Sequence, residues 1–526
     1  MEEAPADDGV RAGQGIALAR TRSGQVAGYV SSDILTFKGI PYADTTAGEH
    51  RFMPPRPAPA WEGVRSCRHY GPVAPQDKGT GRFNDEEAFI FQWNDSVESE
   101  DCLRLNIWTP GTEGNARRAV MVWLHGGGYA AGSSHDLPAF DGENLARQGD
   151  VVVVSLNHRL NLLGFLDLSA HGDRYAASGN VGMLDIVAAL EWIRDNIAAF
   201  GGDPARVMIF GQSGGGAKVS TLMGMPAAQG LFHRAGVMSG SFTRPATRES
   251  SRRLTDLFLA ELGLDGTQVE RLHTLPYLTL RQAAAAVTAR ENAPFPGFVD
   301  VRAVGGRLDF GPVVDGEILP AAPFGSTAPA MSRDVPMIIG STLNEFVSGI
   351  NQPDAQAMDE AELQRRAEAF VPGRGGEIVA AVRARTPDAS PFDLWSRIAT
   401  SPVRQSAIDQ AAAKASAGGA PAYLYWFTWQ TPVLDGRPAA FHCLDIPFVF
   451  ANTARCASMT GGGASARRLS DRISAAFVAF AKTGNPRHAD LPSWPPFNPT
   501  EMPSMVFDDQ PGVANGPDRD ELARVV

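Results

Sequence analysis

From about residue 103 onward, short apolar runs alternate with segments that carry apolar residues at helical spacing. VVVVSLNHR (151–159) begins as a continuous apolar run, as buried strands of parallel sheets do. MLDIVAALEWIRDNIAAF (183–200) has the spacing of a helix. This alternation predicts an α/β fold with a large, mostly parallel central sheet and helices on both faces. Further strands are expected at RLNIWTP (104–110), AVMVWLH (119–125), RVMIFG (206–211), RAGVMSG (234–240), VPMIIGS (335–341) and AYLYWFTW (422–429).

The stretch FGQSGGGAKVS (210–220) places one serine among four glycines directly after a predicted strand. A phosphate-binding P-loop needs a lysine immediately after its last glycine, but Ala217 follows Gly216 and Lys218 comes one position late. We expect the Lys218 head group to lie in solvent instead. A nucleophile elbow needs Gly-x-Ser-x-Gly between a strand and a helix, and residues 211–215 supply it. An ordinary strand-to-helix turn with a surface serine is the alternative.

Three side chains near predicted strand ends fit acyl-transfer chemistry: Ser213, Glu345 and His442. A serine hydroxyl is a weak nucleophile until a base takes its proton, and an imidazole has a pKa suited to that task. A carboxylate on the other ring nitrogen fixes the imidazole tautomer. The chain order serine, acid, histidine is that of α/β-hydrolases. Asp445 is an alternative acid, and a buried structural role is the alternative for His442.

Glycines near two of these strand ends can supply the donors that an acyl-transfer reaction needs. Gly127 and Gly128, in HGGGY (125–129), follow a predicted strand and can offer bare backbone N–H groups. Gly214 adds the N–H that follows the nucleophile. Together they predict an oxyanion hole for a tetrahedral intermediate.

Composition excludes several classes of partner. Lys+Arg minus Asp+Glu is 47 − 58 = −11, without a basic block, so neither nucleic acid nor an anionic membrane is expected to bind. No apolar run reaches the length of about 18 residues that a membrane span needs. The four cysteines form no C-x-x-C pair, so no metal site is expected. The length of 526 residues would by itself suggest two to four domains.

Several segments in order resemble the type-B carboxylesterases, the family that includes the cholinesterases. These segments are FKGIPYA (37–43), SEDCLRLNIW (99–108), HGGGY, NHRLNLLGF (157–165), residues 179–216 and AFHCLDIPFVF (440–450). The resemblance implies one α/β-hydrolase domain over residues 1–526, with long loops that form a gorge and a loosely ordered N-terminal segment at 1–18.

Matched position by position, the family's functional residues fall on the residues already singled out. The resemblance implies Ser213 as nucleophile, Glu345 as acid and His442 as base, with Gly127, Gly128 and Gly214 as the oxyanion donors. It also implies that Ser239, in MSGS, and Asp445 support this triad from behind.

The resemblance also implies a disulfide between Cys67 and Cys102 that closes a loop over the gorge. Such a bond indicates an oxidising compartment, so we expect a secreted or periplasmic protein, with a cytoplasmic one as the alternative. The acidic start MEEAPADDGV is not a signal peptide, so the signal is expected outside this chain. No pairing is implied for Cys443 and Cys456.

Two residues depart from the family's usual elbow, G-E-S-A-G. Gly214 replaces the alanine but keeps the N–H, and Gln212 replaces the glutamate beside the nucleophile. A glutamate at this position would favour cationic substrates through its negative charge. Gln212 carries no charge, so we expect neutral esters to be preferred over cationic ones of similar size.

The sequence therefore predicts a serine carboxylesterase that hydrolyses small-molecule esters through an acyl-enzyme, without a cofactor, as a monomer or weak homo-oligomer. One alternative is a specialised hydrolase of a bulky ester, lactone or carbamate, and another is a non-catalytic binding module of the same family. Phe89, Phe91 and Trp93 either wall an aromatic pocket or pack their loop against the body of the protein.

Overall fold

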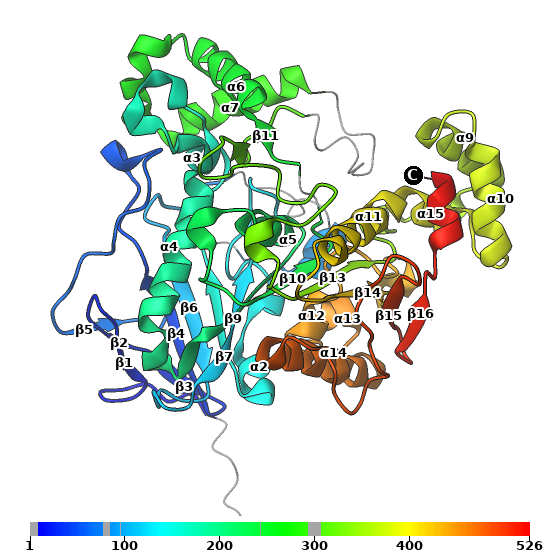
Figure 1. The fold of residues 1–526 in the computed structure, drawn as a ribbon, viewed down its shortest axis with the longest axis horizontal. Coiled ribbons are helices and arrows are strands. Elements are labelled where there is room, and N and C mark those ends of the chain that lie inside the picture. The colour runs from blue at the N-terminus through cyan, green and yellow to red at the C-terminus, as the bar shows by residue number, and fades with distance from the viewer. Residues whose placement is uncertain (1–8, 77–84, 95, 242–243, 293–306, 526) are drawn as a thin grey trace, which may run out of the picture.

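One large sheet runs through the molecule in the computed structural model, which describes residues 9–76, 85–94, 96–241, 244–292 and 307–525 (Figure 1). Within these residues its eleven strands lie in the order β16-β15-β14-β13-β10-β9-β7-β8-β6-β4-β3. The seven strands from β15 to β8 are parallel, and antiparallel strands lie at both edges. The predicted mostly parallel sheet is confirmed. Its strands are β3 (Tyr29–Ser31), β4 (Ile34–Pro41), β6 (Arg104–Thr109), β7 (Arg118–Leu124), β8 (Val152–Leu156), β9 (Gly202–Gln212), β10 (Arg234–Met238), β13 (Met337–Thr342), β14 (Ala422–Phe427), β15 (Pro503–Phe507) and β16 (Gly512–Asn515).

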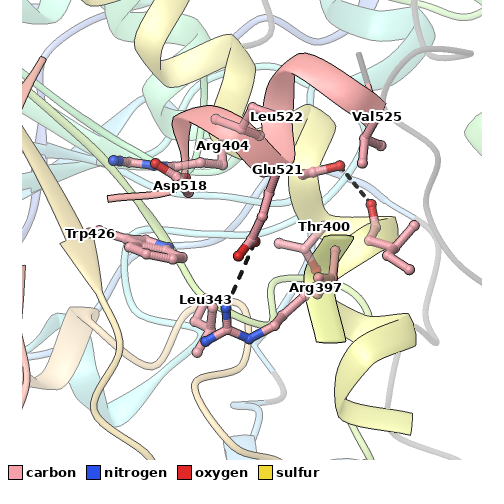
Figure 2. Close-up of a pocket in the computed structure, with 12 residues that line it drawn as sticks. Leu343, Arg397, Thr400, Arg404, Trp426, Asp518, Glu521, Leu522 and Val525 are labelled. Atoms are coloured by element: carbon pink, nitrogen blue, oxygen red, sulfur yellow. Dashed lines mark hydrogen bonds and ion pairs between the residues drawn. The ribbon is translucent and has the colours of Figure 1, made fainter. Parts of the chain in front are cut away.

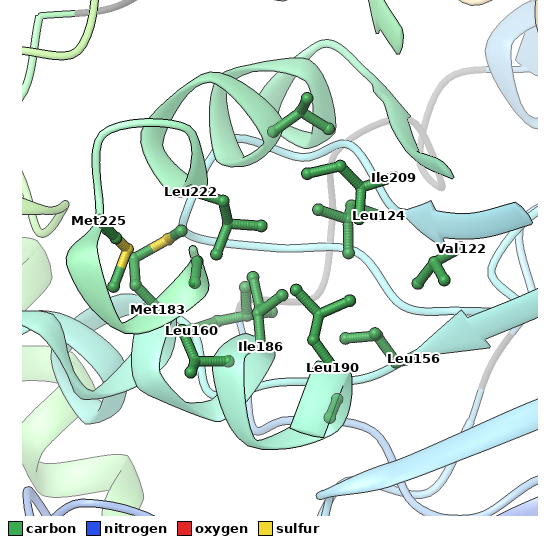
Figure 3. Packing of buried hydrophobic residues seen from close by; sticks show 14 of the residues in the cluster. Val122, Leu124, Leu156, Leu160, Met183, Ile186, Leu190, Ile209, Leu222 and Met225 are labelled. Carbon is green, nitrogen blue, oxygen red and sulfur yellow. The ribbon is translucent and has the colours of Figure 1, made fainter. Parts of the chain in front are cut away.

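Helices cover both faces of this sheet because successive strand side chains point to opposite sides. In β7, Val122 and Leu124 join one apolar cluster, whereas Met121 and Trp123 join the other. Figure 3 shows part of the first cluster, in which side chains of β7, β9, α4 and α5 pack together. The second cluster includes side chains of α1, α2, α12, α13 and α14. The helices are α1 (Asp85–Phe91), α2 (Glu143–Gly149), α3 (Asn161–Phe165), α4 (Val181–Asn196), α5 (Gly214–Leu222), α6 (Arg248–Glu261), α7 (Tyr277–Glu291), α9 (Glu360–Phe370), α10 (Gly375–Arg385), α11 (Pro391–Ser416), α12 (Ile446–Val449), α13 (Ala457–Thr460), α14 (Ala464–Thr483) and α15 (Arg519–Val525).

Smaller units lie around the main sheet. Helices α9, α10 and α15 gather at the right of Figure 1, where they share a third apolar cluster with α11. A small sheet joins β1 (Leu18–Arg20), β2 (Gln25–Ala27) and β5 (Val64–Ser66), and β11 (Ala246–Thr247) pairs with β12 (Val313–Val314).

The N-terminal segment 1–18 is described only in part. Residues 1–8 lie outside the described residues, and Arg11 forms an antiparallel bridge with Val30. None of the helices in the described ranges is both long and apolar enough to cross a membrane.

Candidate active site

Ser213 sits at the sharp turn between the end of β9 and the start of α5. Its backbone angles, φ 56° and ψ −125°, are costly for a residue with a side chain. The turn is held on both sides: the Ser213 N–H donates to the Met238 carbonyl at 2.8 Å, and the Ser213 carbonyl accepts from the N–H of Ala217 at 3.1 Å. Such a turn exposes the serine hydroxyl above the sheet. In the described chain this hydroxyl forms no hydrogen bond.

Gly214 is where the turn meets the loop after β7, residues 125–128, which we call the oxyanion loop. A Cβ on Gly214 would lie 2.4 Å from the backbone of Gly128, so a side chain does not fit while the loop keeps this position. Gly127 has φ 81° and Gly128 φ 61°. Among the described residues, the N–H groups of these two glycines donate to no protein acceptor, and both glycines line the cavity described below.

Glu345 and His442 meet above the ends of β13 and β14. Nδ1 of His442 lies 2.5 Å from Oε2 of Glu345, whose other oxygen accepts from the Thr342 N–H at 2.8 Å. The backbones also pair, because the His442 N–H donates to the Glu345 carbonyl at 2.9 Å. The Glu345 side chain is fully buried and that of His442 is 14% exposed. The ring of Phe346 packs on the imidazole with the centroids 3.9 Å apart.

Gln212 contacts the same imidazole from the side of the elbow. Its amide nitrogen lies 3.1 Å from Nε2 and 3.3 Å from Nδ1 of His442. Its amide oxygen accepts from the Cys443 thiol at 3.3 Å, which orients the amide nitrogen toward the ring. The sequence located Gln212 beside Ser213 but gave no sign that it would contact the histidine.

Asp445 and Ser239 lie behind this pair, and neither hydrogen-bonds to His442 in the described structure. The Tyr425 hydroxyl donates to Oδ2 of Asp445 at 2.7 Å, and Oδ1 has no partner. Burial, followed by the charge of Glu345, raises the pKa of Asp445 to about 7. The hydroxyl of Ser239 is buried without a partner among the described residues. The acid that contacts His442 is Glu345.

Lys218 corrects one expectation from the sequence. Its side chain is fully buried, not in solvent, and Nζ donates to the His125 carbonyl at 2.9 Å. The reason is that the oxyanion loop folds over the side of α5 that carries Lys218, which helical spacing alone does not reveal. Burial lowers the pKa of Lys218 to about 7.

A cavity of about 740 Å³ opens above Ser213 and His442. Rings line much of it, including Phe91 and Trp93 at the end of α1, whereas Phe89 is 51% exposed and does not line it. Of the three aromatic residues for which the sequence left a pocket wall and loop packing open, two line the cavity. Its described lining contains no lysine or arginine, and its carboxylates are Glu87, Glu98, Asp136 and Glu345.

A second, much smaller cavity lies away from Ser213. Figure 2 shows this cavity, beside α15, where Glu521 pairs with Arg397 at 3.8 Å. Its volume of about 20 Å³ suits a single water molecule, and Oδ1 of Asp518 in its wall lacks a partner that a water would supply. In the described ranges, no three His, Cys, Asp or Glu side chains gather as metal ligands would.

The predicted disulfide is absent from this structure, in which Cys67 and Cys102 are free thiols, as are Cys443 and Cys456. Burial raises the pKa of Cys67 to about 11 and moves that of Cys102 upward as well. Because the thiolate is the form that forms disulfides, both thiols are poorly reactive here. The expectation of export rested on this bond and loses that support.

Comparison with known proteins identifies the family of this chain. The model of the carboxylesterase family matches residues 17–524. The chain belongs to the carboxylesterase family. It is 33% identical over 510 residues to the para-nitrobenzyl esterase of Bacillus subtilis (strain 168), covering 97% of this chain and 98% of that one. It is 34% identical over 505 residues to the phenmedipham hydrolase of Pseudarthrobacter oxydans, covering 94% and 95%.

Solved structures of esterases share the fold. An esterase from anaerobic Clostridium hathewayi, reported to hydrolyse aliphatic aromatic polyesters, superposes with a TM-score of 0.83 at 36% identity, covering 97% of each chain. The Geobacillus stearothermophilus carboxylesterase Est55 superposes with a TM-score of 0.78 at 34% identity over 97% of this chain. This member of the carboxylesterase family therefore has the α/β-hydrolase fold and is a hydrolase of carboxylic esters.

Proposed function

We propose that this carboxylesterase forms an acyl-enzyme on Ser213. The hydroxyl oxygen of Ser213 attacks the ester carbonyl carbon, His442 takes the hydroxyl proton on Nε2, and the carbonyl electron pair moves to oxygen. The N–H groups of Gly127, Gly128 and Gly214 stabilise that oxyanion. The intermediate collapses by breaking the bond to the alcohol oxygen, which receives the proton from His442.

Water completes the cycle by the same steps. His442 takes a proton from water as the water oxygen attacks the acyl carbon, and the Ser213 oxygen leaves with that proton. Glu345 keeps the imidazole in the tautomer with Nε2 unprotonated and stabilises the imidazolium. The observation that carries this proposal is the strained turn that exposes Ser213 beside the cavity onto which the His442–Glu345 pair also faces. In free enzymes the serine–histidine hydrogen bond often tightens only when substrate binds, which fits the absence of that bond here.

We further propose bulky, uncharged esters with an aromatic part as the substrates. A cavity of about 740 Å³ is large enough for a drug-sized molecule, and its rings favour flat apolar groups. A relative named for para-nitrobenzyl ester hydrolysis and one reported to act on aliphatic aromatic polyesters support an aromatic substrate. The relative named a phenmedipham hydrolase motivates including phenmedipham in the same substrate panel.

Labelling and substitution test the nucleophile together. A serine-directed phosphonate should add one label, on Ser213, and Ser213→Ala should lose about 10⁵–10⁶-fold in kcat with an unchanged melting temperature. Ser416→Ala is the control, because Ser416 is exposed at the end of α11 and lies outside the described lining of the cavity. A label on another residue, or ordinary activity in Ser213→Ala, would refute the proposal.

A further inference from the structure

Lys218 is a fully buried cation that the proposed reaction steps leave unused. It lies five residues after Ser213 on α5, and Nζ bonds the carbonyl of His125, the first residue of the oxyanion loop. This contact ties the helix that follows the nucleophile to the loop that supplies two oxyanion donors. A buried lysine without a structural or chemical task would cost folding free energy, since an apolar residue of similar size could replace it.

The hydrogen bonds beneath the loop fix the direction of its N–H groups. Lys218 holds the His125 carbonyl, and Nδ1 of His125 lies 2.9 Å from the Gly126 carbonyl, so it must donate there. In a trans peptide the N–H points opposite to the C=O. The N–H of Gly127, which shares a peptide with the Gly126 carbonyl, therefore points away from this buried side and toward the cavity.

Among the described residues, Lys218 forms its hydrogen bond with a backbone carbonyl and not with a carboxylate. His125, Tyr129 and Asp136, on the segment after β7, and His158, after β8, are the titratable groups around it. Burial, then the charge of Lys218, lowers the pKa of His125 well below its usual value, so this imidazole is neutral. Nζ lies 5.8 Å from the centre of the Tyr129 ring, and the negative charge of Asp136 favours the ammonium form. An anion that forms nearby would therefore feel the ammonium directly.

We propose that Lys218 is a positioning residue for the oxyanion loop: its ammonium group holds the loop from the buried side and places a positive charge behind the N–H donors. The inference rests on the proposed acyl-enzyme mechanism. The Lys218 charge and the hydrogen bonds to the His125 and Gly126 carbonyls both make the N–H groups of the loop stronger donors to the oxyanion. Neither changes the binding of the uncharged ester in the ground state. Lys218 thus contributes to kcat and not to KM.

The test compares Lys218→Met with Lys414→Met. Lys414 is a matched control, because it too is fully buried and donates to backbone carbonyls, those of Ser332 and Arg333, and none of these three residues is in the described cavity lining. We expect Lys218→Met to lower kcat about tenfold with KM within twofold, whereas Lys414→Met keeps both. Wild-type kcat and KM in Lys218→Met would overturn the proposal.

An aryl trifluoromethyl ketone supplies the readout that a merely structural role would not move. The Ser213 oxygen adds to its carbonyl carbon, His442 takes the serine proton, and the electron pair on the former carbonyl oxygen makes a stable oxyanion. Its affinity should fall about tenfold in Lys218→Met, in step with kcat, while the affinity for the corresponding methyl-ether ground-state analogue stays unchanged. Equal loss for both compounds would indicate a damaged fold and would overturn the proposal.

The pH dependence of the wild-type enzyme, compared with that of Lys218→Met, gives a further check. Deprotonation of Lys218 removes the charge, so ketone affinity and kcat should decline as pH rises through about 7, and this decline should be missing in Lys218→Met. A wild-type profile that is flat above pH 7 would overturn the role of the charge. If Ser213→Ala still binds the ketone as tightly, it is the acyl-enzyme mechanism that fails, not the inference about Lys218.

Discussion

Two carboxylates lie near His442, and only one of them touches it. Glu345 bonds Nδ1 at 2.5 Å, whereas Asp445 bonds the Tyr425 hydroxyl. We expect Glu345→Gln to lower kcat by about 10³–10⁴-fold, because an amide in this place stabilises the wrong tautomer and no imidazolium. Asp445→Asn should stay within about tenfold of wild type. Steady-state kinetics at one saturating ester concentration rank the two, and the opposite ranking would exclude Glu345 as the acid.

Asp445 should instead appear in the pH dependence of stability. Its pKa is raised to about 7 in the folded protein, so between about pH 4 and pH 7 the unfolded chain has lost a proton that the folded protein retains. The free energy of unfolding therefore falls as pH rises through this window. Asp445→Asn should flatten that fall and melt higher than wild type at pH 8, with little difference at pH 4. Parallel melting curves at both pH values would contradict the prediction.

Gln212 offers a test of charge selectivity at the reacting centre. A carboxylate about 5 Å from a substrate cation, at an effective dielectric of about 20, is worth about 3 kcal/mol, and half of that is about tenfold in kcat/KM. We expect wild type to prefer the tert-butyl isostere over a choline ester, and Gln212→Glu to shift that ratio about tenfold toward the cation. The other carboxylates of the cavity act equally in both proteins and so cancel in this comparison. A clear preference of wild type for the choline ester would contradict this expectation about Gln212.

At the scale of elements, the proposed site depends on how closely the loop after β7 approaches the start of α5. Gly214 lies against Gly128 with no room for a Cβ. We expect Gly214→Ala to push the oxyanion loop outward and lower kcat about 10–100-fold, since a displacement near 1 Å misplaces its donors. Alanine is the better helix former, so the melting temperature should not fall much. Full activity in Gly214→Ala, measured with the same ester, would show that the loop tolerates this shift.

The elements themselves were largely predictable, because apolar periodicity records which face of a strand or helix is buried. The runs at 119–125 and 206–211 are β7 and β9, and the serine-containing turn follows β9 as expected. Contacts between distant segments were not predictable. The helical spacing of the sequence predicts that Lys218 lies at the surface. Its burial is explained only by the loop at His125, whose carbonyl accepts a hydrogen bond from Nζ. The contact of Gln212 with His442 likewise joins residues 230 positions apart.

At the scale of the whole molecule, charge sets which esters can reach the cavity. The chain carries a net charge of −11, and the described lining of the cavity adds Glu87, Glu98 and Asp136 without a lysine or arginine. Counting Glu98 alone, a substrate carboxylate about 10 Å away, at an effective dielectric of about 40, is opposed by about 0.8 kcal/mol. We expect this charge to oppose an anionic ester both during its approach and inside the cavity.

We therefore expect the monoester anion of an aromatic diacid to have a kcat/KM at least about fourfold below that of its neutral methyl diester. Salt separates this effect from a poor steric fit, because the Debye length shortens from about 10 Å at 0.1 M to about 3 Å at 1 M. The kcat/KM for the anion should rise steeply with ionic strength while that for the neutral diester stays nearly constant. Converting Glu98 to Gln should remove part of the penalty for the anion alone, with Glu377→Gln, a surface change beyond the cavity lining, as control. A penalty that neither salt nor Glu98→Gln reduces would mean that shape, not charge, excludes the anion.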